Sequence, residues 1–204
     1  MNIVEGISKW IKTKLTFLQT DENTIEYTFL ILGEKSTGKS SFLYRATNSK
    51  FKLEMQPSEE SICQNIVLNL FDQRFNIYLI DVAIQDLTKS HSYLFENIHG
   101  AFIFYDVTKR KTFDKIESFV VDIRNNLGNK IPILILGNKN DLLHLKEVHS
   151  KELEEKAMDL NCDFMEITCT EEESSMNAIK FLVFKSYYVG LNEQKQAYLN
   201  KFLS

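Results

Sequence analysis

The chain has 204 residues, of which 44% are hydrophobic and 25% charged, a composition that is typical of one globular domain and excludes wholesale disorder. A formal net charge of -4 argues against a nucleic-acid-binding protein that acts through bulk positive charge. The 3 cysteines form no CxxC pair and are too few for a disulfide framework, so we expect reduced thiols and no zinc site.

The first 26 residues are predicted to be an amphipathic extension ahead of the folded domain. The apolar residues at helical spacing are Ile3, Ile7, Trp10, Ile11, Leu15 and Leu18. Residues 1–18 then either insert shallowly into a membrane surface, with Trp10 at the interface, or fold onto the domain or onto a partner. Asn2 stands where N-myristoylation requires glycine, and the segment lacks the pattern of a secretory signal.

Residues 27–189 are predicted to form a single α/β domain, followed by a tail at 190–204. Tyr27–Leu32 is a continuous apolar run, typical of a strand buried on both faces. Ile62–Phe71 and Arg74–Ile80 are separated by Asp72 and Gln73, a gap that only antiparallel neighbours can bridge. Further strands are predicted at Ala101–Tyr105, Ile131–Leu136 and Phe164–Thr168, with helices at Lys39–Ser49, around Phe113–Ile123, at Ser150–Leu160 and around Ile179–Tyr187. This alternation indicates a doubly wound, mostly parallel six-stranded sheet with one antiparallel strand and helices on both faces.

A phosphate-binding loop is predicted between the first strand and the helix that follows it. Gly33–Ser40 matches the pattern G-x-x-x-x-G-K-S/T, in which glycines let successive backbone N–H groups converge on phosphate oxygens. The helix start adds free N–H groups and the positive end of the helix dipole. Lys39 is expected to neutralise the β- and γ-phosphates and Ser40 to ligate Mg²⁺, while Asp81 is expected to hold a Mg²⁺-bound water. The phosphate-site residues are Gly33, Lys35, Ser36, Thr37, Gly38, Lys39, Ser40 and Ser41.

A base-binding segment is predicted after the strand at Ile131–Leu136, where Asn138, Lys139 and Asp141 spell N-K-x-D. The Asp141 carboxylate can accept two hydrogen bonds from N1 and N2 of guanine, a pattern that adenine does not offer. Such donor–acceptor matching discriminates strongly, because the wrong base leaves polar groups unpaired. The alternative is an Asx turn that caps the next segment.

With these residues in hand, the chain resembles the Ras-superfamily small GTPases, closest to the Rab and Ras branches, from about Tyr27 to Tyr188. The resemblance is carried by the phosphate loop with Ser41-Phe42-Leu43, by Tyr105-Asp106-Val107-Thr108 and by Gly137–Asp141. It implies a P-loop NTPase fold, GTP or GDP with Mg²⁺ as ligands, effector and regulator proteins as partners, and a role in membrane trafficking or signalling. The implied location is cytoplasmic or peripheral on a membrane.

The resemblance also assigns roles to residues outside the two motifs. It places Phe51 on the guanine ring, Ser58 of switch I on Mg²⁺, and a backbone N–H of Thr168-Cys169-Thr170 against guanine O6. No cysteine follows Cys169, so C-terminal prenylation is not expected.

The segment that corresponds to Asp-x-x-Gly-Gln departs from the family and bears on catalysis. Gln85 is kept and, with Lys39, is the expected catalytic residue, because it can orient the attacking water. Ile84 replaces the glycine, and a β-branched residue resists the backbone change of a switch. Lys35 either excludes an arginine finger, supplies positive charge itself, or points to solvent.

Two functional hypotheses follow. The first is a regulatory switch with weak GTPase activity, in which GTP and water give GDP and phosphate slowly. The second is a pseudo-GTPase interaction module that binds nucleotide without switching or hydrolysing. An ATP-using kinase is disfavoured, because no acceptor-binding lid is visible and Asn138–Asp141 points to guanine.

Overall fold

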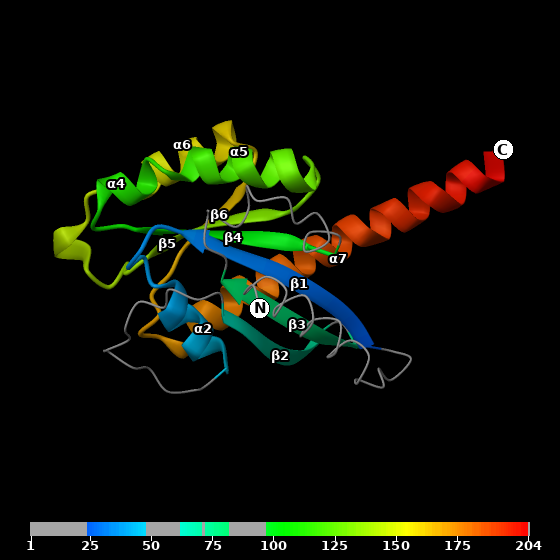
Figure 1. Ribbon diagram of the computed structural model, residues 1–204, viewed down its shortest axis with the longest axis horizontal. Coiled ribbons are helices and arrows are strands. Elements are labelled where there is room, and N and C mark those ends of the chain that lie inside the picture. The colour runs from blue at the N-terminus through cyan, green and yellow to red at the C-terminus, as the bar shows by residue number, and fades with distance from the viewer. Residues whose placement is uncertain (1–23, 48–61, 71, 82–96, 204) are drawn as a thin grey trace, which may run out of the picture.

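A computed structural model of the chain describes residues 24–47, 62–70, 72–81 and 97–203. Within these ranges, six strands form one sheet in the order β2-β3-β1-β4-β5-β6 (Figure 1). The strands are β1 (Thr24–Gly33), β2 (Ile62–Leu70), β3 (Gln73–Asp81), β4 (Gly100–Asp106), β5 (Ile133–Asn138) and β6 (Asp163–Glu166). The helices are α2 (Lys39–Thr47), α4 (Arg110–Phe113), α5 (Ile116–Leu127), α6 (Ser150–Asp159) and α7 (Glu172–Leu203), with a short 3₁₀ helix at Leu143–Leu145.

The strand pairing confirms the predicted α/β fold. β1 pairs in parallel with β3 and β4, and the parallel series continues through β5 to β6. β2 is antiparallel to β3, and Asp72 between them has a left-handed φ of 57°. The carboxyl ends of the five parallel strands therefore meet at one edge of the sheet, where the loops of such folds bind ligands.

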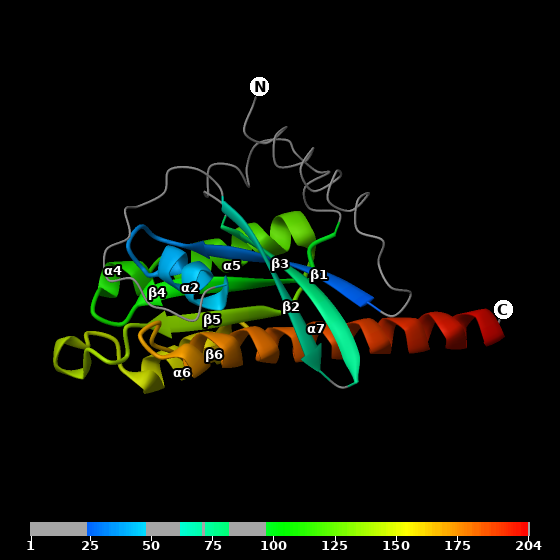
Figure 2. The ribbon, with the colours of Figure 1, turned by 90° about the horizontal axis from the view of Figure 1, so that it is seen from below.

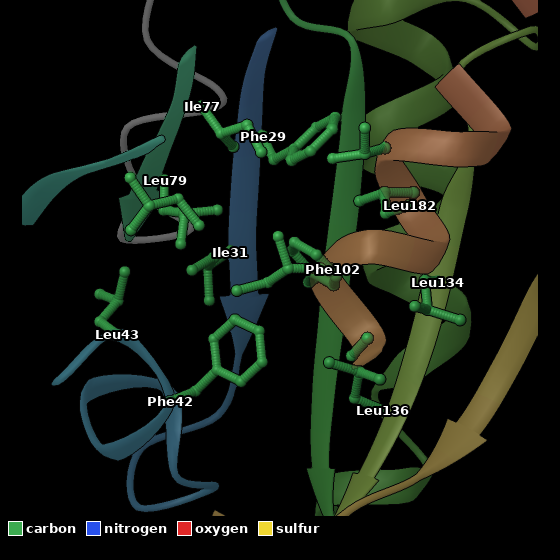
Figure 3. Packing of buried hydrophobic residues seen from close by; sticks show 14 of the residues in the cluster. Phe29, Ile31, Phe42, Leu43, Ile77, Leu79, Phe102, Leu134, Leu136 and Leu182 are labelled. Atoms are coloured by element: carbon green, nitrogen blue, oxygen red, sulfur yellow. The ribbon is translucent and has the colours of Figure 1, made fainter. Parts of the chain in front are cut away.

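Two helical layers cover the sheet, one on each face. α2 and α7 lie on one face, and α4, α5 and α6 lie on the other (Figures 1 and 2). Phe29 and Ile31 of β1 pack toward Phe42 of α2 and Leu182 of α7 (Figure 3). Leu30 and Leu32, which alternate with Phe29 and Ile31 along β1, pack in the opposite layer against α5. Because both faces are buried, the strand reads as one continuous apolar run.

Several element boundaries differ from the sequence predictions. The helix predicted around Phe113–Ile123 is divided into α4 and α5, and β6 ends at Glu166, so Thr168 lies in the following loop rather than in a strand. α7 runs without interruption across residue 190, because a single glycine in a helix interior costs only about 1 kcal/mol. Residues 1–23, which carry most of the predicted amphipathic extension, are outside the described residues. No helix in the described ranges combines the length and apolar character needed to cross a bilayer.

Candidate functional site

The loop between β1 and α2 depends on glycine at two positions. Gly33 and Gly38 have φ angles of +144° and +100°, values that residues with a Cβ rarely adopt. A Cβ on Gly33 would lie 2.4 Å from the Phe104 carbonyl oxygen, and one on Gly38 would lie 1.9 Å from Asn138 Nδ2. Ser36 has a left-handed φ of 63°. The loop is therefore a tight turn that is packed closely against its neighbours.

Hydrogen bonds within this loop hold its backbone in a curve. Lys39 Nζ donates to the carbonyl oxygens of Gly33 and Glu34, at 2.8 and 3.1 Å. The buried Thr37 hydroxyl also donates to the Glu34 carbonyl, at 2.9 Å. The first-turn N–H groups of α2 have no acceptor within the helix, and N–H groups in such a position are suited to bind an anion.

Lys39 and Asp81 influence each other electrostatically across this loop. Burial lowers the pKa of Lys39, and the nearby Asp81 carboxylate opposes that change. Burial raises the pKa of Asp81, and Lys39 opposes it in turn. The parallel pairing of β1 with β3 places Asp81 level with Ile31, near the start of the loop. The Asp81 carboxylate is thus near enough to Lys39 for each group to oppose the effect of burial on the pKa of the other.

Asn138 connects a second loop to the first. It ends β5, is 2% exposed, and donates from Nδ2 to the Thr37 carbonyl oxygen at 2.9 Å. Its Oδ1 is buried and has no hydrogen-bond partner within the described part of the chain. Such an orphaned acceptor is uncommon in a folded protein, and it lies beside the phosphate loop, where a bound molecule can supply the missing donor.

Lys139, the residue after Asn138, has a left-handed φ of 68°. Its side chain forms an ion pair with a buried carboxylate. Its Nζ lies 2.6 Å from Asp106 Oδ2, and the Asp106 side chain is fully buried. The backbone N–H and hydroxyl of Thr108 donate to Asp106 Oδ1 at 3.0 and 2.7 Å. Although burial alone raises the pKa of Asp106, the hydrogen bonds from Lys139 and Thr108 outweigh it, and the pKa is lowered overall.

We expect Asp106→Asn to lower the free energy of unfolding by about 2 kcal/mol near neutral pH, because it breaks this buried cluster. A carboxyl group whose folded-state pKa is lowered stabilises the fold above its unfolded pKa of about 3.9 and loses that contribution as the pH falls through the folded value. The difference between variant and wild type should therefore shrink below about pH 4.

Urea unfolding across a pH series measures this difference. Glu117→Gln is the control, because the ion pair between Glu117 and Lys156 is solvent-exposed and should contribute little at any pH. A difference for Asp106→Asn that stays constant down to pH 2 would contradict the assignment.

The third loop follows β6 and contacts the other two. Thr168 Oγ1 donates to Asp141 Oδ1 at 2.6 Å, and the Cys169 sulfur lies 4.0 Å from the Gly38 carbonyl oxygen. Burial raises the pKa of the Cys169 thiol to about 11, so this thiol is unreactive at neutral pH. From the last turn of α2, Arg45 donates to the backbone carbonyls of Cys169 and Thr170.

The structure places most of the sequence-predicted site residues at one edge of the sheet. They lie in the three loops or in the strand and helix ends that border them: Gly33, Lys35, Ser36, Thr37, Gly38, Lys39, Ser40 and Ser41, then Asn138, Lys139 and Asp141, then Thr168, Cys169 and Thr170, with Asp81 at the end of β3. Lys35 and Ser36 are exposed. Phe51, Ser58, Ile84 and Gln85 are outside the described residues. The chemical roles of all these residues stay predictions.

Sequence reasoning missed two residues that shape these loops. Asp106 ends β4 at the same sheet edge at which Asp81 ends β3. Its place at the end of a predicted strand could therefore have marked it as a candidate from the sequence. Arg45 had no such signal, because its partners lie 124 and 125 residues away along the chain.

The residues present fit a nucleotide with a divalent cation. The phosphate loop offers backbone N–H groups and a lysine, and Asn138 offers a buried acceptor without a partner in the described chain. The described residues contain no cluster of three or more His, Cys, Asp or Glu side chains able to hold a metal ion. A magnesium ion would thus rely on hydroxyl, phosphate and water oxygens besides Asp81, which are ligands that Mg²⁺ prefers.

This combination of fold and loops defines a P-loop nucleotide-binding protein of the α/β class. The sequence model of the Ras family matches residues 28–187, so the chain belongs to the Ras family of small GTPases. It is similar to the GTP-binding protein ypt3 of Schizosaccharomyces pombe, with 28% identity over 88% of this chain and 84% of the relative. It is also similar to the Ras-related protein RABA1c of Arabidopsis thaliana, with 27% identity over 83% and 79%. RabZ of Dictyostelium discoideum is 30% identical over 71% of this chain and 64% of that protein. These relatives make the chain Rab-like within a family whose members bind GTP or GDP, generally with Mg²⁺.

Proposed function

We propose that this protein binds GTP and GDP with Mg²⁺ and works as a regulatory switch that hydrolyses GTP slowly. The observation that supports this most strongly is the hydrogen bond from Asn138 Nδ2 to the Thr37 carbonyl. It joins the base-binding segment to the phosphate loop, so that base and phosphates of one ligand would contact a single connected unit. That arrangement suits a nucleotide better than a free phosphate or a free base.

In this proposal each loop holds one part of the nucleotide. Lys39 and the N–H groups of Gly33–Ser40 hold the phosphates, and Ser40 ligates Mg²⁺ together with Ser58 while Asp81 acts through water. Asp141 accepts hydrogen bonds from N1 and N2 of guanine. A backbone N–H of the Thr168–Thr170 loop donates to O6, and Phe51 stacks on the ring.

Hydrolysis would be an in-line attack of water on the γ-phosphate. Lys39 offsets the negative charge that develops on the phosphate oxygens, and Gln85 orients the attacking water. When bound, Mg²⁺ supplies further charge stabilisation. Hydrolysis is slow because Ile84 stands where a glycine would change conformation, and because the exposed Lys35 obstructs access by a partner's arginine.

A second candidate function is a pseudo-GTPase module, and Ile84 is the observation that favours it. If the backbone at this residue does not rearrange around the γ-phosphate, GTP and GDP complexes present the same surface. Under the first candidate, effectors distinguish the two complexes. The Rab names of the relatives suggest membrane trafficking as the process in which such effectors act.

Nucleotide content and single-turnover hydrolysis of the purified protein test both candidates. We expect guanine nucleotide to co-purify and to be released on denaturation, and we expect GTP hydrolysis to be slower than that of an ordinary Rab protein measured in parallel. Ile84→Gly should accelerate hydrolysis, whereas Ile84→Val should not. A wild-type rate equal to the Rab rate would refute slow hydrolysis. A rate of zero in both wild type and Ile84→Gly would favour the pseudo-GTPase.

A further inference from the structure

Arg45 joins the helix after the phosphate loop to the loop expected to read the guanine base. Its Nε donates to the Cys169 carbonyl oxygen at 3.2 Å, and its Nη2 donates to the Thr170 carbonyl oxygen. Two donors of one planar guanidinium thus engage two consecutive carbonyls. This geometry depends on the rigid fork of arginine, which neither lysine nor glutamine provides.

The backbone N–H groups of the same loop differ in whether they have a hydrogen-bond acceptor. The Thr168 N–H donates to Ser174 Oγ at 3.1 Å, and the Thr170 N–H donates to Thr168 Oγ1 at 3.2 Å. The Cys169 N–H donates to no acceptor within the described part of the chain. Cys169 as a whole residue is 4% exposed, and backbone N–H groups of buried residues usually have an acceptor. A carbonyl group of a ligand is the natural partner for it.

Asp141 is held by a separate contact. Thr168 Oγ1 donates to Asp141 Oδ1 at 2.6 Å and also lies 2.7 Å from Thr170 Oγ1. These contacts do not involve the carbonyls that Arg45 holds, but Thr168 Oγ1 also accepts a hydrogen bond from the Thr170 N–H. The Asp141 contact therefore has to be measured separately from the backbone at Cys169.

We propose that Arg45 is a positioning residue for base specificity, because it fixes the backbone that directs the Cys169 N–H toward guanine O6. The proposal rests on the proposed function, since it requires a guanine nucleotide in this site. Arg45 acts through the loop and does not itself touch the base. Arg45 lies on α2, which begins at Lys39 of the phosphate loop. The orientation of the backbone at Cys169 is therefore linked to the phosphate site.

The test compares GDP with two analogues that each alter one edge of guanine. The analogue 6-thio-GDP replaces O6 by a weaker acceptor and reports the Cys169 N–H contact. IDP lacks the N2 amino group and reports the Asp141 contact. Affinities of wild type, Arg45→Gln and Arg45→Lys for all three nucleotides are measured by isothermal titration calorimetry on nucleotide-free protein.

The matched control is Arg124→Gln. Arg124 on α5 also donates from its guanidinium to two consecutive backbone carbonyls, those of Leu160 and Asn161, but it lies on the opposite face of the sheet from α2. It therefore reports what the loss of an arginine-to-carbonyl clamp does to the fold alone. Thermal unfolding of each variant checks that the domain remains folded.

We expect wild type and Arg124→Gln to prefer GDP over 6-thio-GDP by about tenfold, the value of one good hydrogen bond. In Arg45→Gln this preference should fall to about twofold, and Arg45→Lys should be intermediate, because one donor remains. The preference for GDP over IDP should stay within about twofold of wild type in every variant, because Thr168 still holds Asp141.

Three results would overturn the inference, and they are distinguishable. A wild type that binds neither GDP nor its analogues would refute the proposed function and this inference with it. A wild type that binds GDP normally, together with an unchanged 6-thio-GDP preference in Arg45→Gln, would refute the role of Arg45 alone. An equal loss of both preferences in Arg45→Gln would assign the residue to general support of the site and would also refute base positioning.

Discussion

Asp141→Asn is expected to change the preferred base from guanine to xanthine. The new side-chain amide places an N–H donor opposite the N2 amino group of guanine, so that two donors face each other and the hydrogen bond is lost. Xanthine carries a carbonyl oxygen at that position and accepts from the amide. The hydroxyl of Thr168, which donates to Asp141 Oδ1, would retain the amide oxygen and thus direct the amide nitrogen toward the base.

The expected size is a loss of roughly 100-fold in GDP affinity, because the hydrogen bond to N2 is lost and two donors are left facing each other without an acceptor. XDP affinity should rise above GDP affinity in the variant, and competition against a fluorescent nucleotide measures both. Asp159→Asn, at an exposed position on α6, is the control and should leave both affinities unchanged. An Asp141→Asn variant that still preferred GDP would show that this carboxylate does not read the base.

Gly38→Ala is expected to abolish nucleotide binding. The added Cβ would lie 1.9 Å from Asn138 Nδ2, so the Asn138 amide would have to move away and lose its hydrogen bond to the Thr37 carbonyl. Because that bond joins the phosphate loop to the base-binding segment, both parts of the site would separate. We expect GDP affinity to fall by more than about 100-fold and co-purified nucleotide to disappear.

Gly128→Ala is a matched control for the backbone part of this effect. Gly128 has a left-handed φ of +85°, and a Cβ there would meet nothing within 4 Å. Both variants therefore carry the strain of an alanine at positive φ, about 1–2 kcal/mol, but only Gly38→Ala carries the collision. GDP affinity of Gly128→Ala should match wild type. Affinity in Gly38→Ala within threefold of wild type would contradict the close packing at Asn138.

Local pattern was sufficient to predict the sheet and the phosphate loop. Runs such as Tyr27–Leu32 are apolar without interruption because both faces of the parallel strand are covered, and that signal is present in the sequence itself. Gly33–Ser40 was recognisable because its glycine spacing follows from the turn geometry of the loop, which the φ angles of Gly33 and Gly38 now show.

The contacts that join the loops could not be predicted from the local sequence pattern. Lys139 donates a hydrogen bond to Asp106, although 33 residues separate them in the sequence. Arg45 donates one to the Cys169 carbonyl across a separation of 124 residues. Such pairs depend on strand order, which brings β4 beside β5 and α2 beside α7. The left-handed φ of Ser36 was also unpredictable, because serine carries no preference for that conformation. Residues 48–61 and 82–96, which hold Phe51, Ser58 and Gln85, are outside the described residues.

The two hydrophobic layers have a consequence for how this chain can diverge. They are built from strand and helix residues such as Phe29, Phe42 and Val120, whereas Lys35 and Ser36 stand at the exposed tip of the phosphate loop. A substitution at Lys35 or Ser36 therefore removes no side chain from either hydrophobic layer. The exposed tip of this loop can differ in sequence while the two layers that cover the sheet keep their packing.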